Sequence, residues 1–153
     1  MWRNLHDASV SETCKAEWFK VIHDILPTHD RLHKIRLSPT NRCRNCPETD
    51  TIAHRILACG NGREIWHWTE KRLAQILNTS PDHIPDQWPT CPQFTLRPQQ
   101  RNRAASWMMS TLITFRTQSH LDSTLQDYIE IVKSSRWKLS TKANSGEGWE
   151  LYF

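Results

Sequence analysis

Apolar residues recur at spacings of three and four along most of this chain, which is the period of helices with one buried face. Residues 11–26 carry such a stripe, and Pro27 is expected to end the helix because the residue before a proline avoids the α region. Thr28 is a suitable N-cap for a short second helix through Arg36, whose Leu32 and Ile35 are expected to face inward.

The same period predicts further helices over residues 51–57, 63–77, 100–117 and 122–137. Asn78 is a stop signal for the helix over 63–77. Prolines are concentrated between residues 79 and 98, where they exclude a helix and favour an extended connection. Trp88 and Phe94 are expected to hold that connection against the fold.

The composition leaves little room for a large core. Hydrophobic residues make up 37 % of the 153 residues and the mean hydropathy is −0.68, although eight tryptophans offer large apolar areas. A chain this polar gains from a metal ion that links its segments. Its net charge of +4 is compatible with a polyanionic partner but does not require one.

No stretch of the sequence is typical of a membrane span or a secretory signal. The first fourteen residues contain charged side chains and no apolar run, and nowhere do about 20 apolar residues follow one another. We therefore expect a soluble intracellular protein, in the nucleus or the cytoplasm, with no membrane partner.

The cysteines argue for metal binding rather than disulfides. Their number is odd, and three of the five lie close together beside a histidine. Zinc accepts thiolate and imidazole ligands in a tetrahedron, and a Cys-x-x-Cys pair brings two thiolates to one ion. The expected ligands of one structural zinc ion are Cys43, Cys46, His54 and Cys59. The alternative is that these are reduced core cysteines near a chance histidine, and Cys14 and Cys91 are expected to be structural or free thiols.

The expected fold is therefore mainly α, with a small helical domain organised around a Cys3His zinc knuckle, a Pro-rich connection and a C-terminal helical pair. We expect a zinc-binding domain at 11–78, the connection at 79–99, a helical hairpin packing on the first part at 100–139, and a flexible tail at 140–153.

Basic side chains gather around the predicted knuckle. A metal site surrounded by arginines suits phosphate contacts on nucleic acid, and an ordinary solvated face is the alternative. Trp66, His67 and Trp68 are candidates for base stacking, although the helical register of Trp66 favours the core. A second basic cluster, Lys133, Arg136, Lys138 and Lys142, suits either a nucleic-acid backbone or a helix end. The candidate nucleic-acid contacts are Arg31, Lys34, Arg36, Arg42, Arg44 and Arg55.

Signals for catalysis are weak. His23-Asp24 and His29-Asp30 are adjacent pairs that a hydrolase would use, but such a reading needs further metal ligands, and none stands at helical spacing. Glycine-rich phosphate loops and nucleophile elbows are absent from the sequence. We expect no catalytic residue and no small-molecule substrate.

Several motifs together resemble one known family. Trp18-x3-Ile22, Leu26-Pro27-Thr28-x2-Arg31-Leu32, Cys43-x2-Cys46, Asp50-Thr51-x2-His54, Cys59 and Trp66 follow one another as in the zinc-binding region downstream of the reverse transcriptase in non-LTR retrotransposon polyproteins. The resemblance covers about residues 15–77, and the helices over 100–137 resemble the C-terminal extension of some such elements. No Tyr/Phe-x-Asp-Asp polymerase motif occurs in the chain.

The resemblance implies that Cys43, Cys46, His54 and Cys59 hold zinc and that the module holds template RNA or target DNA during target-primed reverse transcription. A reverse transcriptase domain is then a further expected partner. The alternative function is a zinc-stapled protein-interaction module with Trp88 or Trp107 facing its partner.

Overall fold

The computed structural model describes residues 10–85, 100–118 and 123–142. These residues form α-helices together with one π-helix and one 3-10 helix, and their only β pairing is an isolated bridge between Arg42 and Thr49. The mainly α fold class is therefore confirmed. The elements are α2 (Glu12–Ile22), α3 (His29–Lys34), the π-helix η1 (His54–Ala58), α4 (Gly62–Leu77), the 3-10 helix η2 (Pro81–His83), α5 (Gln100–Gln118) and α6 (Leu125–Lys142).

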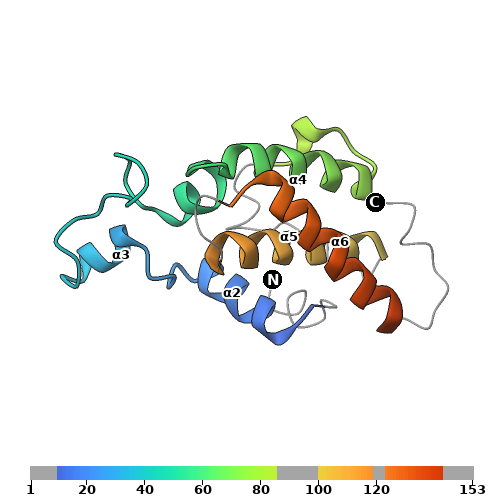
Figure 1. The fold of residues 1–153 in the computed structure, drawn as a ribbon, viewed down its shortest axis with the longest axis horizontal. Helices are drawn as coiled ribbons and strands as arrows, with labels where there is room; N and C mark the ends of the chain where they lie inside the picture. Colours follow the sequence, from blue (N-terminus) through green and yellow to red (C-terminus); the bar gives the residue numbers. More distant parts are fainter. Residues whose placement is uncertain (1–9, 86–99, 119–122, 143–153) are drawn as a thin grey trace.

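Helix α5 forms the centre of the core. It packs against α2 on one side and α4 on the other, and also contacts η1 and α6 (Figure 1). Every residue from 104 to 113 is buried, so this helix is enclosed all round rather than along one stripe. Its Ser110 and Thr111 hydroxyls are satisfied internally, since both donate to the carbonyl of Trp107 at 2.9 Å.

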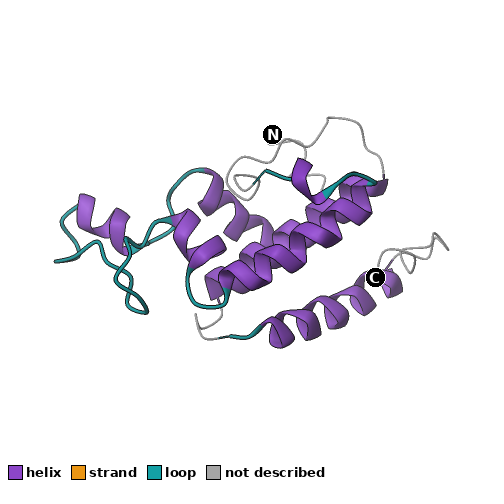
Figure 2. Ribbon diagram, turned by 90° about the horizontal axis from the view of Figure 1, so that it is seen from above, coloured by secondary structure: helices purple, strands orange, loops and turns teal. Residues whose placement is uncertain are grey.

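The helices around α5 supply the remaining core side chains. Trp18 and Val21 of α2, and Ile65, Leu73 and Ile76 of α4, are almost fully buried. Figure 2, seen from above, places α6 along one side of this bundle. Tyr128 of α6 is fully buried there, and its hydroxyl accepts a hydrogen bond from Thr69 at 3.3 Å.

Left-handed residues end the first two helices earlier than the sequence predicts. Asp24 has φ 53°, and the N–H groups of Asp24 and Ile25 bond back to the carbonyls of Val21 and Lys20, which is a Schellman ending of α2. The helix therefore stops at Ile22 rather than just before Pro27.

The expectation that Ile35 faces inward was wrong. It is the C-cap of α3, and the chain turns away at Arg36 (φ 61°), which leaves the Ile35 side chain 52 % exposed. The N-terminal end of the same helix is as expected, because the Thr28 side chain accepts from the Arg31 N–H at 3.3 Å.

The core joins both halves of the chain in one hydrophobic cluster, which runs from Trp18 to Val132. The division into a domain at 11–78 and a hairpin at 100–139 stays a prediction. Helix α6 includes residues 140–142 of the tail expected at 140–153. The rest of that tail lies outside the described residues, as do Trp88, Cys91 and Phe94. The proline-rich segment begins with the short 3-10 helix η2, which the extended connection expected from the prolines did not include. No described helix has the length and apolar character needed to cross a membrane.

Helix α3 and the loop after it extend away from this bundle, at the left of Figure 1. Asp50 links α3 to η1. Its buried carboxylate accepts from the backbone N–H of His29 at 2.8 Å and from the Arg55 guanidinium at 2.5 and 3.2 Å. This extension carries Cys43 and Cys46, whereas His54 and Cys59 belong to η1 and its C-cap, next to α4 and α5.

Candidate metal centre

A short hairpin presents the first two cysteines. The Cys43 N–H donates to the Glu48 carbonyl at 2.8 Å, and the Asp50 N–H donates to the Asn41 carbonyl at 2.9 Å. The Asn45 N–H points back to the Cys43 sulfur at 3.4 Å, as expected for a tight turn between two thiolates that share one ion. Cys43 is buried and Cys46 is half-buried.

The π-helix η1 presents the other two candidate ligands. Cys59 lies five positions after His54, and in an α-helix this spacing puts two side chains about 140° apart around the axis. Here the Cys59 N–H bonds to the His54 carbonyl at 2.8 Å, the wider i→i+5 turn of a π-helix. This turn brings both side chains to one side, and Thr51 supports its start by accepting from the His54 N–H at 3.1 Å.

The four side chains meet at one point. Their ligand atoms all lie within 4.8 Å of one another, with Cys43 Sγ 3.4 Å from Cys59 Sγ and Cys46 Sγ 3.3 Å from His54 Nε2. Tetrahedral zinc, with bonds of about 2.3 Å to sulfur and about 2.0 Å to nitrogen, sets such separations near 3.8 and 3.6 Å. The donor set and its spacing therefore fit zinc, and four protein ligands leave no position for a catalytic water.

The Cys59 thiol resists ionisation in the absence of a bound cation. Burial raises the pKa of the Cys59 thiol to about 12, with help from its hydrogen bond to Cys43 and the charge of that neighbour. Burial also acts on Cys43, but hydrogen bonds, first the one from the Asn45 N–H, outweigh it and lower its pKa. Three thiolates cannot share this space unless a bound metal ion offsets their charge.

A buried arginine from the core, absent from the sequence predictions, closes the back of this site. Arg116 of α5 is 2 % exposed and donates to the carbonyls of Arg55 at 2.8 Å, Ile56 at 3.2 Å and Cys59 at 2.7 Å. Burial lowers its pKa, and the charge of Cys59 opposes that shift. No local sequence signal marks Arg116, because its partners lie about sixty residues earlier in the chain.

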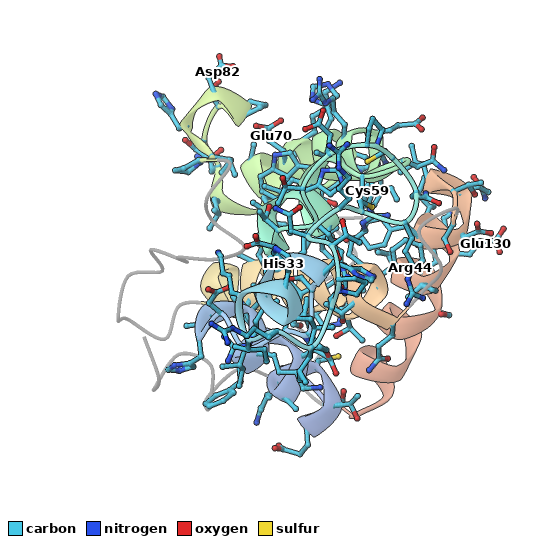
Figure 3. All side chains as sticks on the ribbon, turned by 90° about the vertical axis from the view of Figure 1, so that its left-hand side faces the viewer. His33, Arg44, Cys59, Glu70, Asp82 and Glu130 are labelled. Atoms are coloured by element: carbon cyan, nitrogen blue, oxygen red, sulfur yellow. The ribbon has the colours of Figure 1, made fainter. Side chains whose placement is uncertain are left out.

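The predicted nucleic-acid contacts fall into two groups. Lys34 and Arg55 are paired with Asp30 (2.6 Å) and Asp50 (2.5 Å), and the Arg31 guanidinium donates to the Asp24 carbonyl. The others are exposed, and no described carboxylate lies within ion-pair distance of them; these are Arg36, Arg42 and Arg44. Figure 3 views this end of the molecule, with His33 and Arg44 labelled.

Two of the aromatic candidates are not displayed for partners. Trp66 is 6 % exposed and belongs to the core, which confirms its helical register rather than a stacking role. Trp107 is 4 % exposed, so the expectation that it faces a partner protein was wrong. Trp68 is half-buried, with its ring edge-on to Tyr128 at 5.6 Å and the Arg72 guanidinium 5.2 Å from it.

The geometry defines a small Cys3His zinc module seated on a helical core. The sequence model of the family described as zinc-binding in reverse transcriptase matches residues 1–66, which include all four ligand positions. This match confirms the resemblance to the zinc-binding region of reverse transcriptases, and it covers that region rather than a polymerase domain. No curated protein and no solved structure matches the chain.

Proposed function

We propose that this zinc module binds RNA or DNA through the phosphate backbone, as an accessory region and without catalysis of its own. In a reverse transcriptase context the nucleic acid would be template RNA or target DNA. One observation carries the proposal: the hairpin that turns Cys43 inward displays the two flanking arginines, Arg42 and Arg44, on the outside.

The alternating directions of Arg42, Cys43 and Arg44 connect the zinc site to nucleic-acid binding. Neighbouring residues of an extended segment point to opposite sides, so a metal that fixes Cys43 also fixes the direction of Arg42 and Arg44. Arg42 is held further by its bridge to Thr49 and by donating to the Pro47 carbonyl at 3.3 Å. Two guanidinium groups on a rigid support suit bidentate contacts to phosphate, with little ordering left to occur on binding.

A salt titration of Arg42→Ala/Arg44→Ala tests the proposal. If each arginine contacts one phosphate, the double variant should lower the slope of log K against log salt by about 1.4 on single strands and 1.8 on duplex DNA. At 0.1 M salt this corresponds to a loss in affinity of about 25- to 60-fold. Binding is measured by fluorescence anisotropy on labelled single-stranded RNA, single-stranded DNA and duplex DNA.

Two other exposed cations provide the matched control. Arg63→Ala/Lys71→Ala removes the same charge from two exposed positions of α4, a different element from the hairpin. It should leave the salt slope nearly unchanged. Equal losses in the two double variants would mean that net charge alone drives binding, and an unchanged slope in Arg42→Ala/Arg44→Ala would refute the proposed contacts.

A second function, docking of a partner protein, is favoured by exposed apolar side chains on the extension. Ile35 is 52 % and Leu37 73 % exposed, on either side of the left-handed Arg36. If this function holds, Ile35→Ser/Leu37→Ser should weaken capture of a reverse transcriptase domain while leaving nucleic-acid affinity unchanged. The reverse pattern would exclude it.

A further inference from the structure

The buried guanidinium of Arg116 stands out because it lacks an anionic partner among the described side chains. Its described hydrogen bonds go to the backbone carbonyls of Arg55, Ile56 and Cys59. A cation buried without a compensating charge is costly, and neutral carbonyls compensate it only in part. Some nearby negative charge is therefore needed to balance it.

The zinc centre supplies a charge of the required sign. Zn²⁺ with three thiolates and a neutral imidazole carries a net charge of −1. The Cys59 residue joins the two groups directly, since its sulfur faces Cys43 at 3.4 Å while its carbonyl accepts from Arg116 at 2.7 Å. The charged guanidinium and the charged metal site thus lie on opposite ends of one residue.

The fold keeps space for this contact. Gly62 opens α4 directly beyond the knuckle, and a Cβ at that position would lie 2.9 Å from Nη2 of Arg116 and 3.2 Å from the Ile56 carbonyl oxygen. Any larger residue there would force the end of the Arg116 side chain or the η1 backbone to shift. The contacts of Arg116 therefore also depend on glycine at position 62.

We propose that Arg116 is a positioning residue and counter-charge for the zinc centre, so that metal binding in the knuckle and packing of α5 in the core stabilise each other. Arg116 lies outside the residues that match the zinc-binding family. The helical core would then be part of the metal site, and losing zinc would weaken the packing of α5. This inference does not depend on nucleic-acid binding.

The test compares each variant of the full chain with and without zinc. Arg116→Met keeps most of the side-chain length but removes the charge and the donors, and Arg116→Lys keeps the charge but cannot reach three carbonyls. Arg63→Met is the control, because it removes an exposed charge from the first turn of α4. Zinc affinity is measured by competition with a chelator, thermal unfolding by circular dichroism, and ligand geometry from the absorption spectrum of the Co²⁺ form.

Arg116→Met should bind zinc about 10- to 100-fold more weakly, the usual effect of losing a group that orients metal ligands. Arg116→Lys should lose less and Arg63→Met almost nothing. The melting temperature of Arg116→Met should fall more in the zinc-loaded form than in the chelated form. An equal fall in both forms, or zinc affinity within about threefold of the unchanged chain, would reduce Arg116 to a packing role and overturn the proposal.

Gly62→Ala covers the case in which Arg116→Met does not fold. It retains every charge but crowds Nη2 of Arg116 together with the backbone of Ile56 and Leu57, so it should lower zinc affinity several-fold and alter the Co²⁺ spectrum. Unchanged affinity and spectrum in a folded Gly62→Ala protein would count against the proposal in the same way.

Discussion

The Asp50–Arg55 pair offers a quantitative test of how the zinc-bearing extension is held. The Asp50 side chain is 2 % exposed and that of Arg55 19 %, and the pair closes at 2.5 Å. Asp50 also accepts from the first N–H of α3 at 2.8 Å. Replacing Asp50 by alanine leaves a largely buried guanidinium and an unsatisfied helix N-terminus.

Breaking one side of a buried ion pair costs about 3–5 kcal/mol. Because Arg55 is partly exposed and can recover some solvation, we expect Asp50→Ala to lower the free energy of unfolding by about 3 kcal/mol, near the low end of that range. Arg55→Met should lower the free energy of unfolding by less, about 2 kcal/mol, because the Asp50 carboxylate still accepts a hydrogen bond from the His29 N–H. The double variant should be more stable than the sum of the two, by a coupling energy of about 1–3 kcal/mol.

Urea unfolding of the zinc-loaded protein, followed by circular dichroism, measures these values. Zinc must be saturating in every sample, because metal bound only to the folded state adds to the apparent stability. Losses that add to within about 0.5 kcal/mol would show that the two side chains do not stabilise each other. The same samples decide whether Arg55 contacts phosphate, since a purely structural Arg55 leaves the salt slope of nucleic-acid binding unchanged in the folded variant.

Two further predictions concern the metal and the pH. The Cys59→Ser variant should not retain zinc at stoichiometric concentration, and its segment around the knuckle should unfold, because metal binding and folding are coupled in small sites. Elemental analysis and thermal unfolding measure these two effects. A variant with full zinc content and an unchanged transition would exclude Cys59 as a ligand. Hydrogen bonds from the N–H and hydroxyl of Thr124 lower the pKa of Asp127 below 3.8. The capping of α6 that these bonds provide should therefore persist above about pH 4 and weaken as the pH falls through the folded-state pKa. An NMR titration of the Asp127 carboxyl carbon checks this, and a midpoint at or above 3.8 would contradict it.

The metal ligands were accessible from the sequence because they are a local pattern. Cys43, Cys46, His54 and Cys59 fall within one short segment, and thiolate and imidazole at such spacing have few other uses. The helices could be predicted for the same reason, because the period of apolar residues and capping residues such as Thr28 are signals that span only a few positions.

What the sequence did not reveal depends on contacts between distant segments. Arg116 sits in a helix whose period suggests one buried stripe, whereas α5 is enclosed by α2, α4 and α6. From the sequence alone, an arginine at this position of the helix is expected to face solvent, because its hydrogen-bond partners are distant in the chain. The π-turn of η1 was also hidden, because it follows from the need of His54 and Cys59 to face one ion rather than from helix propensity.

The end of the family match at residue 66 falls inside α4, which runs on to Leu77. A segment cut at that point and transplanted into another protein would carry all four zinc ligands but neither the second half of α4 nor Arg116. Its Ile56 and Ile65, fully buried here, would lose the α5 side chains that cover them. Transfer of this zinc module to another protein should therefore succeed only where the recipient supplies an equivalent of α5, or where the transferred segment extends beyond Arg116.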